Sequence, residues 1–554
     1  MCAALTKVGD IREGSSITVN GEEGSIPKRL VGVVWQDDLL LSNLTVEENI
    51  YFAARLKTSE RVPDAEVRNV VEETMGELSL THIRHSVVGS PLGVMRGVSG
   101  GERKRVSVGA ELVVRPSLLL LDEPTSGLDA TTAQALIGTL RDLADIGHSI
   151  AVVIHQPRTT IFNMFDHLVL LSKGNMIYDG VPSRARSYLE SCPSVHELPP
   201  ETGIADWIMD VIKEDESRKE GASLANMWTG CQVKQSFVAP PSASATSSDL
   251  STSRRLSSLE ELNAVPRYST GFKTQLKLLT QRTLKQQRGE RLTATAAGLQ
   301  FAYFFFTALF WWQLPDTTAY IFDRNSLLFF MIVAQANGIV ITAVTVFQRE
   351  RALLRRERAK KLYAVSAYFL GKTVSDLTNN VLLPLLYGML VYWTAGYRVE
   401  PDAFFKFTLA FYLTLSTAQA MGIWMSIAIP SMHVALVLAP PLTLFFIIMG
   451  GFYIPYENMH KGVYWASWLS FARYGYSALI INEYAGRDIA CASADELSIS
   501  IGGASDSCPL LGDDIISSLG ISGVAESYWF NVGMCALLQV LFRCAAYVSL
   551  RRSK

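Results

Sequence analysis

Apolar residues are distributed unevenly along this chain of 554 residues. Before Thr293 they occur in short runs of strand length and in patches with helical spacing. After Thr293 they form long runs that match the thickness of a bilayer. This change of pattern predicts a soluble α/β domain followed by an all-α membrane domain.

The soluble domain is expected to span residues 1–205. Its short apolar runs have the character of buried parallel strands, and helical patterns separate them. The predicted elements are strands at 30–35, 118–121 and 150–154, helices at 65–78 and 131–143, and a hairpin of 168–172 with 176–178 around a Lys-Gly-Asn turn. Alternation of strands and helices favours an α/β fold.

Residues 206–270 are expected to link the two domains. A Ser-rich stretch at 236–258 has little apolar content and predicts disorder. Residues 272–291 then combine an apolar stripe with surrounding Lys and Arg, which is typical of a helix on the cytosolic membrane surface. The membrane domain is therefore expected over 271–554.

The membrane domain contains six apolar segments long enough to span a bilayer. They cover residues 292–314, 326–347, 368–393, 404–429, 434–453 and 528–550. The fifth contains Pro440 and Pro441, which predict either a kink or a later start of the helix. Arg543 lies near one end of the last segment, where its side chain is expected to reach the membrane interface.

The distribution of basic residues indicates the orientation. Residues 349–361 carry seven Lys or Arg, whereas the loops at 315–325 and 395–403 carry one each. The positive-inside rule therefore places this basic segment, the soluble domain and both chain ends in the cytosol. The long segment 454–527 then faces outward. The sequence predicts a multi-pass protein of the plasma membrane or of an organelle membrane, without choosing between them.

Composition adds two points. The formal net charge of −2 argues neither for nor against nucleic acid, and no nucleic-acid partner is predicted. The seven cysteines are too few and too scattered for a disulfide scaffold. Cys491 and Cys508 share the outward segment and could pair if that compartment is oxidising.

Candidate catalytic residues follow the predicted strands. Asp122 and Glu123 end one strand, where Asp122 can hold Mg²⁺ and Glu123 can act as general base toward a water molecule. Gln36 follows another strand and can reach the metal and that water. His155 follows a third and can donate to the γ-phosphate of a nucleotide. Each motif alone is more typical of an ordinary turn, but their order and spacing together favour nucleotide hydrolysis.

A second group of residues fits an anion-binding helix start. Ser99, Gly100 and Gly101, followed by Glu102, offer a hydroxyl and bare backbone N–H groups at a predicted helix N-terminus. With the residues up to Arg105 they resemble the signature sequence of ABC-type ATPases, and residues 118–124 resemble the Walker B strand of that family. The sequence therefore predicts an ATPase that uses Mg²⁺ and ATP.

An ATPase followed by six spans on one chain resembles the G subfamily of ABC transporters, the white or eye-pigment type of half-transporter. The matching segments are 33–38, 44–49, 98–107, 118–129, 155–157, 356–358, 450–452 and 482–484. The resemblance implies a D-loop at Ser126, Gly127, Leu128 and Asp129. It also implies a dimer, with itself or with a second half-transporter, in which each Ser99 completes the partner's ATP site.

For the membrane domain, the resemblance implies a coupling helix at 350–361, with Glu350, Arg356 and Glu357. Gln335 and Asn337 at membrane depth are candidate substrate contacts, although such residues more often pack helices together. Phe452 and Tyr453 are candidates for an outer gate, although aromatic residues at a helix end more often anchor it at the interface.

One departure from the family concerns the phosphate-binding loop. No Gly-x-x-x-x-Gly-Lys-Ser/Thr loop (Walker A) precedes the strands, and residues 1–7 resemble the helix that normally follows it. Residues 17–21 resemble the family's next hairpin. Two functions therefore stay open: an ATP-driven exporter of lipids, sterols or xenobiotics whose N-terminus is incomplete here, or a catalytically silent partner subunit in a heterodimer.

Overall fold

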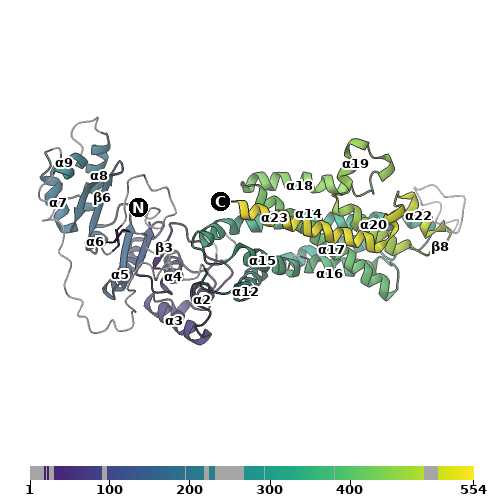
Figure 1. Cartoon of the computed structure of the whole chain (residues 1–554), viewed down its shortest axis with the longest axis horizontal. Coiled ribbons are helices and arrows are strands. Elements are labelled where there is room, and N and C mark those ends of the chain that lie inside the picture. Colours follow the sequence, from purple (N-terminus) through teal and green to yellow (C-terminus); the bar gives the residue numbers. More distant parts are fainter. Residues whose placement is uncertain are drawn as a thin grey trace. The chain divides into compact units, whose positions relative to one another are not determined.

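The computed structural model describes residues 18–19, 22–23, 30–89, 97–193, 195–217, 224–230, 268–291, 293–379, 381–491 and 510–553. The chain divides into two compact units, residues 1–269 and 270–554. Figure 1 shows strands in the first unit and long helices in the second. The predicted helix tail at 1–7, the Ser-rich stretch and Cys508 lie outside the described residues.

A three-stranded parallel sheet forms the centre of the first unit. Its order is β3 (Val31–Val34), β4 (Leu118–Asp122) and β5 (Ser149–Val153). The register pairs Val34 with Leu121, and Asp122 with Val153. All three predicted strands are thus present, with bounds shifted by one residue or two. Their carboxyl ends meet at one edge of the sheet.

Four helices bury one face of this sheet. They are α2 (Val46–Lys57), α3 (Asp64–Glu77), α4 (Gly100–Leu112) and α5 (Ala130–Asp145). Leu119 and Leu121 share a core with their apolar residues, whereas Leu120 packs on the opposite face with Val31 and Val33. This alternation is the two-residue period of a strand. A short hairpin of β1 (Thr18–Val19) and β2 (Glu22–Glu23) matches the one expected near residues 17–21.

The α/β unit extends beyond the expected boundary at residue 205. The hairpin of β6 (Leu168–Ser172) and β7 (Asn175–Gly180) turns at Lys173 and Gly174, both with positive φ. Three helices pack with this hairpin: α7 (Pro182–Glu190), α8 (Ile204–Ser217) and α9 (Leu224–Gly230). Trp207 and Trp228 are buried in their shared core. The expected linker therefore begins too early, because α8 has an apolar face that needs burial.

The second unit is mainly helical, and its described residues also include a pair of short antiparallel strands, β8 (Asp488–Ile489) and β9 (Leu510–Leu511). Its long elements are α12 (Phe272–Arg291), α13 (Ala294–Phe310), α14 (Ile321–Ala359), α15 (Val365–Asn379), α16 (Leu382–Thr394), α17 (Pro401–Ala428), α18 (Met432–Ile448), α20 (Phe471–Tyr484) and α23 (Tyr528–Arg552). Each of the six predicted spans coincides with a helix or a pair of helices. Helix α17 packs against both α14 and α23, and the three run roughly in the same direction along the bundle in Figure 1.

Among the described residues, three helical stretches are long and apolar enough to cross a membrane. They are Thr318–Ala359, Val365–Thr394 and Tyr528–Arg552. The apolar helices α13 and α18 are shorter, with 17 residues each. The predicted third span comprises α15 and α16. In α18, Pro440 and Pro441 lie inside a helix that already begins at Met432, so the later start is wrong.

The basic helix α12 is not simply a surface helix. Phe272, on its predicted apolar stripe, is 47% exposed, whereas Arg282 is 6% exposed. Arg282 donates from both terminal nitrogens to Glu357 near the end of α14, at 2.6 and 3.0 Å. The α12 helix packs against α15, and Gln287 donates to Asp376 of that helix at 2.6 Å. Polar residues therefore form much of the buried face of α12.

Arg543 does not reach the interface as expected. It is 8% exposed, and its terminal nitrogen lies 3.5 Å from the side-chain oxygen of Gln419 on α17. The reason is that α17 and α23 pack closely along their length, so this face of α23 is turned toward protein. The charge is held inside the helix bundle.

The segment 454–527, which is predicted to face outward, contains helices that the sequence pattern did not predict. Besides α20, these are α19 (Lys461–Ser467) and α22 (Gly512–Ser518). Every residue of α20 is buried. Cys491 is disulfide-bonded in the structure. Because Cys508 lies outside the described residues, the Cys491–Cys508 pair stays a prediction.

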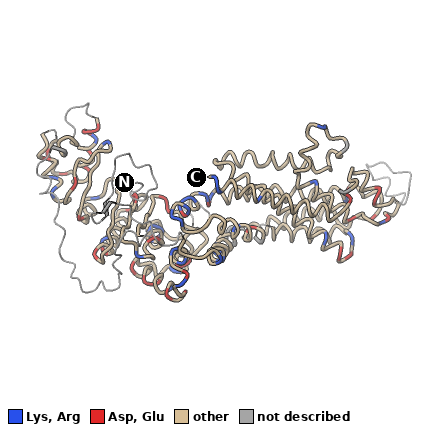
Figure 2. The backbone as a smooth tube through the Cα atoms, viewed as in Figure 1, with Lys and Arg blue, Asp and Glu red and all other residues tan. Residues whose placement is uncertain are grey.

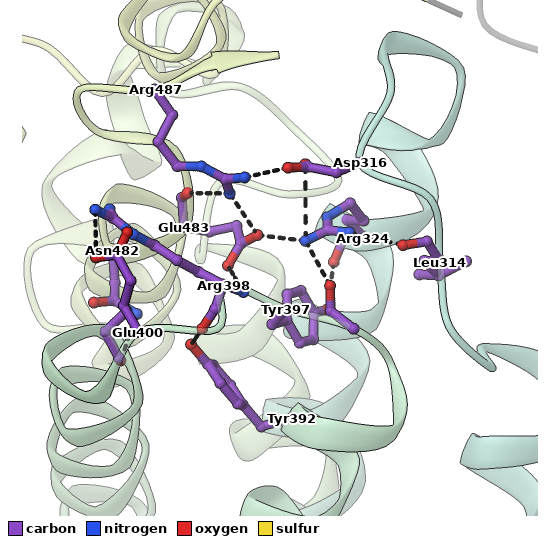
Figure 3. A network of polar contacts seen from close by, with 12 residues as sticks. Leu314, Asp316, Arg324, Tyr392, Tyr397, Arg398, Glu400, Asn482, Glu483 and Arg487 are labelled. Carbon is purple, nitrogen blue, oxygen red and sulfur yellow. Dashed lines mark hydrogen bonds and ion pairs between the residues drawn. The ribbon is translucent and has the colours of Figure 1, made fainter. Parts of the chain in front are cut away.

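A buried ionic network holds the end of α20 against the start of α14 (Figure 3). Arg324 and Glu483 are each 2% exposed, and Nη2 of Arg324 lies 2.5 Å from Oε1 of Glu483. The Arg324 guanidinium also donates to the carbonyls of Leu314 and Gly396, at 2.9 and 3.1 Å. Arg487 pairs with Glu483 at 3.3 Å and with Asp316. Two loops and two helices therefore converge on the Arg324–Glu483 ion pair.

We expect Glu483→Gln to destabilise the second unit by about 3–5 kcal/mol, because it leaves the buried Arg324 with only the partly exposed Asp316, 3.9 Å away, as a counter-charge. The midpoint of thermal unfolding of the purified protein would measure this loss. Glu400→Gln is the matched control: Glu400 pairs with Arg398 at 2.8 Å but is 54% exposed, so its loss should cost at most about 1 kcal/mol. Equal shifts in the two variants would contradict the prediction.

Candidate active site and family

Two of the predicted catalytic residues are in direct contact at the carboxyl edge of the sheet. Nε2 of Gln36, which follows β3, donates to Oε2 of Glu123 at 2.9 Å. Glu123 follows Asp122, the last residue of β4, and its backbone N–H donates to the carbonyl of Val153 on β5. The middle strand thus presents Glu123 between its two neighbours, with Gln36 orienting the carboxylate.

The backbone at this edge is strained. Glu123 has φ of +44°, a left-handed conformation that residues with a side chain rarely adopt. Gln156, which follows His155, has φ of +48°. Such outliers concentrate at functional sites, where the surrounding fold holds them in place. His155 follows β5 at the same edge and has an exposed side chain. The structure therefore places all three residues at one edge and brings two of them together.

The residues at this edge also fit a magnesium ion. No group of three or more His, Cys, Asp or Glu that could enclose a metal occurs among the described residues. A magnesium ion in a nucleotide site needs only one or two protein oxygens, because water and phosphates supply the rest. Asp122 offers a carboxylate there. The Gln36 amide nitrogen bonds to Glu123, which leaves its oxygen as an acceptor for a cation.

The signature residues begin α4 as expected. Ser99 is the N-cap, and its hydroxyl accepts from the backbone N–H of Glu102. The Glu102 carboxylate accepts in turn from the Ser99 backbone N–H and hydroxyl, each at 2.8 Å. Partial burial opposes ionisation, but these bonds hold the pKa of Glu102 below its usual value. This capping box fixes the direction in which the helix N-terminus points.

The expected D-loop residues lie beside the signature helix. Gly127 has φ of +74°, and Asp129 caps α5 by accepting from the backbone of Thr131 and Thr132. Hydrogen bonds from the side chain and backbone of Thr132 lower the pKa of Asp129. A Cβ atom at Gly101 would lie 2.1 Å from Cγ2 of Thr132, so the close approach of α4 and α5 requires glycine there.

Lys104 joins the signature helix α4 to the loop after β3 that holds Gln36, and the sequence did not predict this contact. Lys104 of α4 is only 3% exposed. Its ammonium donates to the carbonyl of Gln36 at 2.8 Å and lies 3.0 Å from Oδ1 of Asp38. A buried lysine is uncommon unless it is paired. The basic run after Glu102 and the Asp37-Asp38 pair after Gln36 were the only signals for this contact.

Comparison with known proteins identifies the family. A model of the ABC transporter ATPase domain matches residues 3–126, and a model described as ABC-2 type transporter matches residues 274–484. ABC transporter G family member 14 of Arabidopsis thaliana is 31% identical over 542 residues, covering 95% of this chain and 79% of the relative. The chain belongs to the G family of ABC transporters.

Animal relatives match over the same extent. The protein named broad substrate specificity ATP-binding cassette transporter ABCG2, of Bos taurus, is 30% identical over 542 residues, or 94% of this chain and 81% of the relative. The predicted family is thus confirmed. This half-transporter carries an ABC ATPase domain, which implies ATP binding and ATP-coupled transport, and it is an integral membrane protein with several apolar helices.

The expected coupling segment is the end of α14 rather than a separate helix. Glu350 lies 2.7 Å from the ammonium of Lys372 and accepts from the hydroxyl of Tyr368 at 3.0 Å. Glu357 pairs with Arg282 and accepts from the hydroxyl of Tyr363. Both carboxylates thus fasten α14 to α12 and α15. Arg356 lies on the same stretch, and its role in coupling stays a prediction.

The candidate substrate residues have mixed environments. Gln335 is buried and accepts from Gln300 of α13 at 3.1 Å, as expected of a residue that packs helices together. Asn337 on the same helix is half-buried, and its side-chain oxygen is buried without a hydrogen bond. Phe452 stacks on Phe329 with ring centroids 4.6 Å apart, whereas Tyr453 is 60% exposed. Their contact with substrate stays a prediction.

We expect Lys104→Met to lower the rate of ATP turnover by about ten- to a hundred-fold, because it frees the Gln36 loop that orients Glu123. The apparent affinity for ATP should change little, since Lys104 touches no described catalytic side chain directly. Steady-state phosphate release at saturating and limiting ATP separates the two effects.

Lys57→Met is the control for that experiment. Lys57 also pairs with a carboxylate of α4, Glu111, at 3.1 Å, and its side chain is also buried. The Lys57→Met substitution should lower the stability of the ATPase unit by a similar amount without lowering the rate of ATP turnover. If both variants lose turnover in proportion to their loss of stability, Lys104 has no special part in positioning Gln36.

Proposed function

We propose that this chain is one half of a dimeric, ATP-driven exporter of hydrophobic or amphipathic molecules. The contact between Gln36 and Glu123 is the observation that carries the proposal. It joins the metal-and-water-binding amide to the general base, at the edge where Asp122 and His155 also lie. A domain with no hydrolytic role has no need for a strained glutamate held by a glutamine.

Each residue has a defined part in the proposed cycle. Glu123 takes a proton from the attacking water, and Gln36 keeps its carboxylate in place. His155 donates to the γ-phosphate. Asp122 and Gln36 would hold Mg²⁺, which when bound neutralises charge on the phosphates. Ser99 and the N-terminus of α4 serve the ATP site of the partner half, which makes hydrolysis depend on dimer formation.

The membrane unit supports transport of apolar molecules. Three features favour it: the match to the ABC-2 type family, the three stretches of spanning length, and the predominantly apolar face of α18. One relative is named for broad substrate specificity, and we extend that property to this chain. We place the ATPase unit and both chain ends in the cytosol on the basis of the seven basic residues at 349–361. The cargo is proposed only as a class.

The experiment measures ATP turnover and ATP-dependent uptake of a fluorescent amphiphile into inside-out proteoliposomes. A parallel preparation restores any in-frame coding sequence upstream of Met1. We expect Glu123→Gln to lower turnover by about 10²–10⁴-fold while nucleotide binding is retained, because only the proton acceptor is removed. Glu66→Gln, an exposed carboxylate on α3, is the control and should leave turnover unchanged.

Two results would contradict the proposal. Equal turnover in Glu123→Gln and the unmodified chain would show that Glu123 is not the base. Absence of turnover in both preparations, despite a folded dimer, would favour a catalytically silent partner subunit instead.

A further inference from the structure

The basic segment at the end of α14, residues 349–361, uses its two carboxylates to hold neighbouring helices. It contains seven Lys or Arg and two Glu. Glu350 pairs with Lys372 of α15 at 2.7 Å, and Glu357 pairs with Arg282 of α12 at 2.6 Å. Figure 2 shows Lys and Arg gathered at the end of the helical unit where the C-terminus lies. The carboxylates of this segment therefore serve cations of other helices.

Two side chains at the start of the segment satisfy the end of α17. The last carbonyls of a helix have no partner within the helix, and Pro430, which follows the C-cap Ile429, has no N–H to offer Ser426. Nε2 of Gln348 donates to the carbonyls of Ser426 and Ile429 at 2.7 and 2.8 Å. Nη1 of Arg351 donates to the carbonyls of Ile429 and Pro430, both at 3.2 Å. Side chains of α14 therefore supply donors that the end of α17 lacks.

Arg358 holds the end of α23 in the same way. Its Nη1 donates to the carbonyls of Leu550 and Ser553 at 2.9 and 3.0 Å, and Ser553 is the C-cap of α23. A cation at a helix C-terminus is also attracted by the partial negative charge of the helix dipole. Within the described part of the chain, neither Arg351 nor Arg358 has a carboxylate within 4.0 Å. The two guanidinium groups are thus used on helix ends rather than in ion pairs.

Apolar side chains fill the space between these polar contacts. Four apolar residues of α14, α17 and α23 line one junction, and each is only 2–3% exposed: Phe347, Leu354, Ile427 and Leu550. A close-packed interior has low compressibility and passes a displacement on rather than absorbing it. The ends of these three helices are therefore expected to move together.

We propose that Arg351 and Arg358 are positioning residues that transmit movement of the basic segment to α17 and α23. The carboxylates of the segment hold α12 and α15, and its arginines hold the other two helices, so one helix end is fastened to four others. Hydrogen bonds from a charged donor are stronger than neutral ones. This inference rests on the proposed function, because it concerns how ATP turnover is coupled to export, and on the coupling role predicted for residues 350–361.

The test measures coupling as the amount of fluorescent amphiphile taken up into inside-out proteoliposomes for each ATP hydrolysed. The full chain is used, in the preparation that turns over ATP. We expect Arg358→Gln to lower this ratio about five-fold while the rate of ATP turnover changes less than about two-fold, because Arg358 joins two helices and is no part of the catalytic edge. A residue that only stabilises the fold would lower uptake and turnover together, so an unchanged ratio would overturn the proposal.

Arg355→Gln is the matched control. Arg355 lies on the same face of α14 between the two positioning residues, is exposed, and makes no hydrogen bond to a helix end among the described residues. The substitution removes the same charge, so the ratio should change less than about 1.5-fold. Arg358→Lys keeps a cation that can donate to two carbonyls, and it should recover about half of the lost coupling. Equal losses in Arg355→Gln and Arg358→Gln would assign the effect to surface charge and overturn the proposal.

A second measurement separates this inference from the proposed function. Hydrogen exchange is followed over residues 546–553, at the end of α23, with and without ATP. ATP should change the exchange of the unmodified chain, and Arg358→Gln should remove that change. The expected exchange result without any ATP-dependent uptake would contradict the export function and support the transmission to α23. No ATP-dependent change in the unmodified chain, or the same change in Arg358→Gln, would overturn the inference.

Discussion

The parallel, in-register pairing of β3, β4 and β5 is the constraint on which the catalytic edge depends. Parallel strands end at the same side of a sheet, so residues far apart in sequence meet there. Gln36 and Glu123 are 87 positions apart, yet their side chains are within hydrogen-bonding distance. A shift of one residue in β4 would turn Leu119 and Leu121 away from the helical core. The burial of these leucines therefore fixes the position of Glu123.

Buried ion pairs also fix the relative positions of elements that are far apart in the sequence. Lys104 pairs with Asp38, 66 positions away, Arg282 joins segments 75 positions apart, and Arg324 joins segments 159 apart. Such pairs add little net stability, because the cost of desolvating both charges offsets their attraction. They do penalise every arrangement in which one charge is left alone. Their effect is to select one relative position of two elements, in the ATPase unit and in the helical unit alike.

Elements with a strong period were predictable from the sequence. The three central strands and the helices α3, α5 and α12 lie within a few residues of their expected positions, because their apolar spacing is unambiguous. The capping box was also visible, since Ser99 and Glu102 have the required spacing. Gln36 and Glu123 could be placed at one edge because each follows a predicted strand of a parallel sheet, but the hydrogen bond between their side chains could not be predicted.

Other features depend on contacts with residues distant in the sequence, which a pattern of neighbouring residues does not reveal. The sequence alone indicates that Arg282 is one more exposed charge on a basic helix. Its burial depends on the ion pair with Glu357, 75 positions away. The sequence alone places Arg543 near the membrane interface. Its burial results from the packing of α17 against α23. The helix α20 was missed because Arg473, Asn482 and Glu483 interrupt its apolar residues, while tertiary contacts bury them all.

Helix α14 is longer than the hydrocarbon core of a membrane is thick. At 1.5 Å per residue its 39 residues extend for about 58 Å, nearly twice the thickness of the hydrocarbon core. Its ends must therefore project beyond the apolar layer, and each end carries charge. Arg324 at one end forms an ion pair with Glu483. At the other end, Glu350 and Glu357 form ion pairs with neighbouring helices. Arg351, Arg355 and Arg358, which share one face of α14, form no ion pair with a carboxylate of the described chain. A stiff helix of this length is therefore held near both ends by ion pairs to neighbouring elements, which select its position along the bundle.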